Sequence, residues 1–269
     1  MSDHVGVGSG CRWKNRKFSR EGQPSTMTSI SAAAPRIGFD RFVALDWATA
    51  ARRVRSGELA REDLNAVLDG AGMTVAARKK TVTLLNRLWL APRPELAEFA
   101  NRGCAIGRIS LDASDAALSW GMSIASYPFF AKVAELVGRL TSLQGDCAAA
   151  EVHRRMSEIY GEREGTLRMT NMVLQTQSDW GAIDRTDRGR RIVRKQVIKL
   201  ADDVLVAWLI EAALRFAGRA VPVASVGSMT VLYPFELDRP LAYLVSRAPA
   251  LELRYQGPGE QLVDIKERL

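Results

Sequence analysis

Apolar side chains recur at steps of three and four residues between positions 129 and 143, which is the period of an amphipathic helix. Pro128 precedes this stretch, at a place that proline tolerates in the first turn of a helix. A second helix is expected over 148–160, and Gly161 supplies the residue that commonly ends one. The stripe of the first helix consists of Phe129, Val133, Leu136, Val137 and Leu140.

The second of these helices has two faces of different character. We expect Val152, Met156 and Ile159 to point inward, because they lie three and four residues apart. Arg154 and Arg155 then point outward, where they are available to phosphate groups.

A third helix is predicted from Thr166, whose hydroxyl suits an N-cap, to about Trp180. At about 100° per residue its side chains separate into two opposite groups. One group is mainly apolar and comprises Met169, Met172, Val173, Thr176 and Trp180. The other group, called here the outward face, comprises Arg168, Asn171, Gln175 and Ser178. Arg, Asn and Gln carry the donors and acceptors that match guanine and adenine edges in the major groove, while Ser is less discriminating.

A short hairpin is expected next, with strands over 182–185 and 190–194 and a turn rich in Asp and Gly over 186–189. It is strongly basic, with a single acid, Asp187, between positions 185 and 195. Arginine binds phosphate through forked, charge-assisted hydrogen bonds, so a hairpin of this charge suits a polyanion. Its basic residues are Arg185, Arg188, Arg190, Arg191, Arg194 and Lys195.

Three helices followed by a basic hairpin predict a winged helix-turn-helix that lies against duplex DNA. The third helix would enter the major groove, and Arg188, Arg190 and Arg191 would contact the neighbouring backbone or minor groove. Arg154, Arg155 and Arg163 would anchor phosphates. Two alternatives stay open: the outward face is simply solvated, or the winged helix docks other proteins.

The rest of the chain is expected to be mostly helical, so the predicted fold class is mainly α. A long apolar helix is predicted over 196–217, and its buried side chains would include Ile198 and Leu205. Further helices are expected at 45–56, 61–68 and 74–90, with another starting near Ser114. Strand character is expected at 229–233 and in a hairpin of 251–255 with 261–265. The expected parts are an arm (1–36), an N-terminal helical module (37–110), the winged helix-turn-helix (111–195) and a small C-terminal α+β module (196–269).

The predicted helix over 74–90 has a basic end beside an apolar stripe. Arg78, Lys79 and Lys80 form that end. The helix is therefore a candidate for a second, wingless helix-turn-helix with these three residues on phosphate. An ordinary bundle helix with a solvated basic end accounts for the pattern equally well.

The net charge of +8 is unevenly distributed along the 269 residues. Residues 1–36 carry six basic and two acidic side chains, whereas residues 196–269 carry eight basic and nine acidic ones. A basic front and a neutral back suit a protein that binds a duplex with one part and other subunits with residues 196–269. The first 36 residues are expected to be a disordered basic arm. Within them, either Met27 is the true start, or residues 12–20 follow a phosphate backbone.

The residues that usually carry catalysis are sparse. The three cysteines form no CxxC pair and the two histidines have no neighbouring ligands, so no metal is expected, and reduced thiols in a cytoplasm are favoured. Asp238, Glu252 and Arg254 only loosely follow a nuclease pattern, and no phosphate-binding glycine loop precedes a helix. Apolar runs are too short to cross a membrane. We therefore expect neither an enzyme nor a cofactor.

Residues 45–195 resemble the small DNA-binding component of BREX phage-defence systems. The similarity lies in residues 77–88, a helix ending in Arg-Leu, and in residues 166–183, a recognition helix that runs into a wing. The resemblance implies duplex DNA binding without catalysis. The expected function is thus a non-enzymatic double-stranded DNA-binding protein of a regulatory or phage-defence system. The alternative is a scaffold subunit whose winged helix docks onto other proteins.

Overall fold

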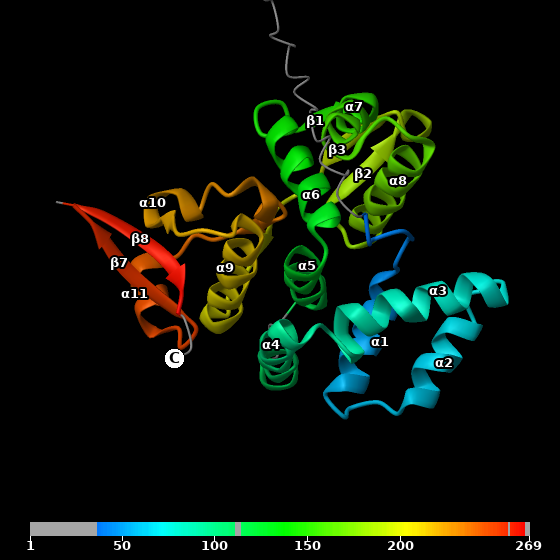
Figure 1. The fold of residues 1–269 in the computed structure, drawn as a ribbon, viewed down its shortest axis with the longest axis horizontal. Coiled ribbons are helices and arrows are strands. Elements are labelled where there is room, and N and C mark those ends of the chain that lie inside the picture. The colour runs from blue at the N-terminus through cyan, green and yellow to red at the C-terminus, as the bar shows by residue number, and fades with distance from the viewer. Residues whose placement is uncertain (1–36, 111–113, 258, 267–269) are drawn as a thin grey trace, which may run out of the picture. The chain divides into compact units, whose positions relative to one another are not determined.

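The computed structural model of the chain describes residues 37–110, 114–257 and 259–266. The predicted N-terminal arm lies outside these residues. The described part is mainly helical, with eleven α-helices and a small amount of sheet (Figure 1), and this confirms the mainly α fold class.

Helices account for the first half of the described chain. Short turns labelled η join some of these helices. Most of them are 3-10 turns, whereas η1 is a π-helical turn. In order, these elements are α1 (Leu45–Arg55), α2 (Arg61–Asp69), α3 (Val75–Leu85), η1 (Asn86–Leu90), η2 (Pro94–Leu96), α4 (Ala97–Ile109), α5 (Asp115–Ser126) and α6 (Pro128–Leu140).

Strands and helices then alternate. The central elements are β1 (Asp146–Ala148), α7 (Ala149–Tyr160), α8 (Glu164–Asp179), β2 (Ile183–Thr186), η3 (Asp187–Gly189), β3 (Arg191–Arg194) and β4 (Ile198–Lys199). The last elements are α9 (Asp203–Ala217), β5 (Val221–Pro222), α10 (Val223–Val226), η4 (Thr230–Leu232), β6 (Phe235–Glu236), α11 (Leu241–Arg247), β7 (Leu251–Gln256) and β8 (Glu260–Ile265).

The strands form three small sheets. In the first, β3 lies between β1 and β2 and pairs antiparallel with both, so that Ile192 faces Cys147 on one side and Arg185 on the other. In the last, β8 pairs antiparallel with β5 and β7. The predicted hairpins at 182–194 and 251–265 are therefore both present. β4 and β6 form a parallel pair.

Helix α5 is the centre of the core. It packs against α1, α6 and α9 (Figure 1), and its residues 116–126 are all buried, as expected for a helix covered on every side. The indole of Trp120 on α5 meets the rings of Phe130, Trp180 and Tyr233 edge-on. One continuous apolar cluster runs from Phe39 to Val263, so the helices before α5 and the strands after α9 share a core.

The helix α8 begins earlier than the sequence indicates. Arg163 is its N-cap residue, and Thr166 lies inside the helix, where its buried hydroxyl donates to the carbonyl oxygen of Gly161. The expectation for Ile159 is also wrong: it is 42% exposed, and Tyr160 takes the buried place beside Phe129. Tyr160 lies four residues after Met156 and so continues the buried face of this helix, whereas Ile159 falls beside it.

Two predictions in the C-terminal part are also wrong. The helix expected over 196–217 begins only at Asp203, because the side chain of Asp202 accepts from the amides of Val204 and Leu205 and caps it there. The strand expected over 229–233 is the 3-10 turn η4. That turn packs closely on α6, where Gly138 leaves room for the carbonyl of Thr230.

Candidate nucleic-acid interface

The outward face of α8 is only partly available to a ligand. Arg168 and Gln175 are exposed, while Asn171 and Ser178 are half-buried. The opposite side of the helix is held by Met169, Val173 and other buried residues that pack toward α6 and α7. Among the described residues, Arg168 has no ion-pair partner. It therefore presents an uncompensated cation to solvent.

Asn171 is engaged within the protein. Arg185 of β2 donates from Nη2 to Asn171 Oδ1 over 3.1 Å, and Asn171 also hydrogen-bonds the ring of His153 on α7. This small network ties α7, α8 and β2 together. Burial and, to a smaller extent, the charge of Arg185 lower the pKa of His153, so its imidazole is neutral at pH 7. Asn171 and Arg185 thus hold the hairpin against α8.

The basic hairpin carries several internal ion pairs. Arg190 pairs with Asp187 at 2.9 Å, and Arg191 pairs with Asp146 of β1 at 2.5 Å. Lys195 lies 3.7 Å from Asp184. By contrast, Arg188 is exposed, without an ion pair in the described part of the chain, and occupies the turn with a φ of 54°. Arg188 is therefore the cation that this turn presents to solvent.

Arg194 belongs to the interior side of the hairpin. It donates to the backbone carbonyl of Tyr233, and its guanidinium lies 5.5 Å from the centre of the Tyr233 ring. Its contacts fasten β3 to the turn η4, and a ligand could reach it only by breaking them.

The arginines of α7 are compensated by acids on the same helix. Arg154 binds Glu151 at 2.7 Å and also pairs with Glu158, and Arg155 binds Glu151 at 2.8 Å. Hydrogen bonds from Arg154 and Arg155 lower the pKa of Glu151 to about 2. Arg163 has no ion pair among the described residues, and its only side-chain hydrogen bond is a long one, 3.4 Å, to Thr166. Of the three predicted phosphate anchors, Arg163 is the most available.

The basic residues of α3 also include both paired and unpaired cations. Arg78 pairs with Asp69 at 2.7 Å and donates to Asn65, which fixes α3 against α2. Lys79 and Lys80 are exposed and unpaired within the described residues. One exposed cation nearby, Arg87, was not among the predicted contacts, because its neighbours come from segments distant in sequence.

Two hollows lie along the extended segment before α1. One, of about 350 Å³, is lined by Phe42, Gln175, Ser178, Asp179 and Arg185, next to the outward face of α8. The other, of about 520 Å³, is lined by Gly38, Asp40, Lys80, Thr83, Leu84, Arg87 and Tyr127. Each hollow therefore places predicted contacts beside the segment 38–42: Gln175, Ser178 and Arg185 in the first, and Lys80 in the second.

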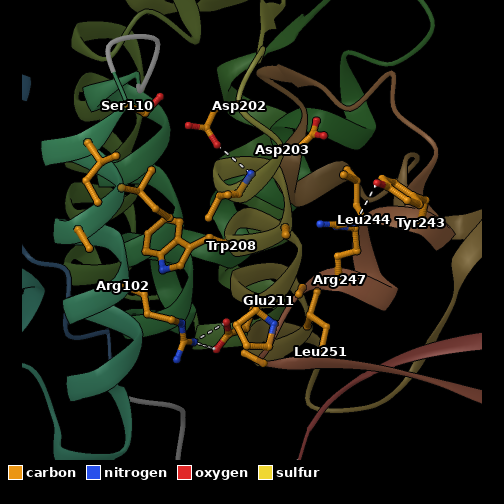
Figure 2. A pocket seen from close by; sticks show the side chains of 18 residues that line it. Arg102, Ser110, Asp202, Asp203, Trp208, Glu211, Tyr243, Leu244, Arg247 and Leu251 are labelled. Carbon is orange, nitrogen blue, oxygen red and sulfur yellow. Dashed lines mark hydrogen bonds and ion pairs between the residues drawn. The ribbon is translucent and has the colours of Figure 1, made fainter.

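A larger groove of about 660 Å³ lies between α4, α9 and α11 (Figure 2). Its rim exposes Ile109, Val204 and Tyr243, which are 82%, 65% and 53% exposed. Its acids are all engaged: Glu211 is held by arginines, Asp202 caps α9, and Asp203 lies 3.5 Å from Arg239. The groove therefore offers mainly apolar surface.

No group of residues that could hold a metal ion is present in the described ranges. Of the loose nuclease pattern, Arg254 and Glu252 pair with each other, and Arg254 also pairs with Asp264 on the β7–β8 hairpin. In the same described ranges, each helix is too short or too polar to cross a bilayer.

Comparison with protein families, curated proteins and solved structures finds no match to this chain.

Proposed function

We propose that this protein binds double-stranded DNA without acting on it as an enzyme, and that residues 128–194 form a winged helix-turn-helix. The order of α6, β1, α7, α8, β2 and β3 supports this, and so does the strand order with β3 in the middle. In such an arrangement α8 is the recognition helix, and the turn between β2 and β3 is the tip of the wing.

The observation that carries the proposal is a pair of uncompensated arginines on two connected elements. Arg168 lies on α8 and Arg188 at the hairpin turn, and the hydrogen bond from Arg185 to Asn171 joins these elements. A duplex whose major groove receives α8 offers phosphates beside that helix, within reach of a wing. Arg168 and Gln175 are then the base-reading candidates, and Arg163 and Arg188 contact phosphate.

The internal ion pairs of the hairpin do not exclude contact with DNA. The Arg190–Asp187 pair joins side chains that are 75% and 56% exposed, and exposed pairs contribute about 0–1 kcal/mol. A duplex with its dense line of phosphates competes well for such an arginine. Arg190 and Arg191 are therefore secondary contacts, and Arg194 is structural.

Binding to a labelled duplex across a salt series tests this assignment. We expect Arg188→Gln to reduce the slope of log K against log salt by about 0.9, because one phosphate contact is lost. Lys266→Gln removes the same charge from an exposed lysine that follows β8, outside the proposed winged helix, and should leave the slope unchanged. Unchanged binding in Arg168→Gln and Arg188→Gln together would contradict the proposal.

Sequence readout is tested separately at α8. If Arg168 reads a base, Arg168→Ala should cost about 1–3 kcal/mol on a preferred site and less on an arbitrary duplex. Selection of bound sequences from a random pool supplies the preferred site. Equal losses on both duplexes would assign Arg168 to phosphate.

The resemblance of residues 45–195 to a BREX component favours a place in a phage-defence or regulatory complex. A scaffold role is the second candidate, and the apolar groove between α4, α9 and α11 favours it, because exposed apolar patches mark interaction sites. Val204→Asp would then abolish co-purification with neighbouring subunits while DNA binding persists. Failure to shift any duplex at low salt would favour the scaffold over DNA binding.

A further inference from the structure

The 520 Å³ hollow beside α3 has the composition of an anion site. Lys80, Thr83 and Arg87 lie on successive turns of one helix face and line it, opposite Gly38 and Asp40. Lys80 and Arg87 are both exposed, and no carboxylate in the described ranges lies within ion-pairing distance of either. We call this hollow the Lys80–Arg87 pocket.

The floor of the pocket is neutral and fixed. Tyr127 donates its hydroxyl to the carbonyl oxygen of Leu84 over 2.9 Å, and burial raises the pKa of this phenol far above physiological pH. The charge of Arg87 acts on Tyr127 in the opposite direction, as expected for a cation close to the ring. The one acid of the lining, Asp40, is exposed and forms an ion pair with neither cation, so two cations face a single acid.

The backbone around the pocket is unusual on both sides. Arg87 lies in the π-helical turn η1, a rare form that is frequent at functional sites. That wider turn buries Leu88 and Trp89 while Arg87 stays exposed. Across the pocket, Gly38 has a φ of 70°, and a Cβ there would lie 3.5 Å from Tyr127 and 4.0 Å from an Arg87 nitrogen. A larger residue would be strained and would narrow the opening.

The pocket is joined to the recognition helix by a short extended segment. The amide of Val43 donates to Thr176 Oγ1 of α8, and the indole of Trp180 donates to the Val43 carbonyl. Phe42, next to Val43, lines the hollow that contains Gln175 and Arg185. The two hollows are therefore consecutive along residues 38–42.

We propose that the Lys80–Arg87 pocket binds a backbone phosphate of the same duplex that α8 reads, so that the DNA footprint continues from α8 across residues 38–42 onto α3. This inference rests on the proposed DNA binding and assigns to it a second contact and a residue, Arg87, outside the winged helix. Lys80 and Arg87 hold the phosphate oxygens, and Thr83 offers a hydroxyl donor.

The salt dependence of duplex binding tests the pocket. Lys80→Gln with Arg87→Gln should reduce the salt slope by about 0.9 if the two cations share one phosphate, and by about 1.8 if each holds its own. The control is Lys266→Gln, with circular dichroism and thermal melting to check that the double variant is folded. A folded double variant with an unchanged slope would overturn the inference.

A variant that is expected to strengthen duplex binding distinguishes the pocket from damage to the fold, because a damaged fold would only weaken binding. Asp40→Asn deletes the only carboxylate of the pocket, so it should tighten duplex binding by about twofold or more at low salt and lose this effect at high salt. No change or weaker binding in this variant would contradict a phosphate at this place.

Two further measurements distinguish a duplex phosphate from a free phosphate or nucleotide, and failure of the pocket from failure of the proposed function. Titration of inorganic phosphate or of a mononucleotide, followed by chemical shifts of Lys80 and Arg87 side chains, should show only weak saturation compared with the duplex. Saturation by the mononucleotide at lower concentration than by duplex would assign the pocket to a free nucleotide and overturn the inference. If no variant or wild-type protein binds duplex, the proposed function itself fails. If wild-type binding depends on Arg168 and Arg188 but not on Lys80 and Arg87, only the pocket fails.

Discussion

The carboxylate of Glu211 lies almost entirely out of solvent between two guanidinium groups. Its side chain is 2% exposed and accepts hydrogen bonds from Arg102 at 2.6 Å and from Arg215 at 2.8 Å. Arg102 also pairs with Glu98, so the cluster joins α4 to α9. Loss of the Glu211 charge would leave Arg215 without an acidic partner among the described residues, and Arg102 with Glu98 alone.

We therefore expect Glu211→Gln to destabilise the fold by about 2–4 kcal/mol, near the lower end of the range for buried pairs, because both arginines keep some solvent contact. Glu158→Gln removes an acid from the exposed pair with Arg154 and should cost no more than about 1 kcal/mol. Urea unfolding of both variants measures the difference. Equal losses would show that the burial of Glu211 has no energetic consequence.

His153 predicts a dependence of stability on pH. Its pKa in the fold is below the usual value of 6.5, first because the ring is partly buried and second because Arg185 is close. The unfolded chain thus binds a proton more readily than the folded one as the pH falls below 6.5, so stability is complete above that pH and decreases below it.

Between about pH 7.5 and pH 5.5, the wild type should lose more stability than His153→Gln, by about 1.4 kcal/mol for each unit of pKa difference once both pKa values are passed. Glu151 does not interfere, because its own contribution is lost only as the pH falls from its ordinary value toward about 2. Parallel urea titrations at the two pH values measure this. Identical pH dependence in both proteins would exclude His153 as its source.

At the scale of the element, α5 is covered by neighbours on every side because its small residues permit close approach. A Cβ at Gly121 would lie 2.2 Å from the indole of Trp208. That indole stacks on the aromatic ring of Phe99, and its Nε1 donates to the backbone carbonyl of Phe99. The indole is therefore held in place and has little freedom to move aside. The glycine sets the distance between α5 and α9.

Gly121→Ala should accordingly destabilise the protein by about 1–3 kcal/mol through overpacking. The matched control is Gly165→Ala in the first turn of α8, where nothing lies within 4 Å of the added methyl group. That change should be neutral or stabilise by up to about 1 kcal/mol, because alanine favours the helix more than glycine does. Chemical denaturation measures both. A mild effect at Gly121 would indicate that α9 shifts freely.

At the scale of the whole molecule, the apolar periodicity of the sequence predicts those helices and strands that are determined by residues within the same segment. The stripe of Phe129 and Val133 and the alternation of residues 251–255 both lead to elements found in the fold. The strand expected at 229–233 fails, because Val231 and Leu232 are buried by a turn packed on α6, and apolar content alone does not distinguish the two.

The candidate interface is less predictable than the fold for a related reason. Counting arginines in the hairpin cannot reveal that Arg191 meets Asp146, 45 residues away, or that Arg194 reaches Tyr233. Nor does spacing alone bring Arg87 beside Gly38. Compensation of charge depends on tertiary neighbours, so the sequence predicts which residues are basic but not which of them remain available to a ligand.

On the proposed DNA-binding function, the shared core beneath α3 and α8 would fix the rotational position at which the molecule meets the duplex. Because Leu84 of α3, Trp120 of α5 and Val173 of α8 belong to one packed cluster, contacts on α3 and α8 could not shift independently of each other. Inserting a single base pair between two contacted stretches would rotate one against the other by about 34°, and half a turn would place it on the opposite side of the duplex. The protein should therefore tolerate changes of sequence between its contacts far better than changes of spacing.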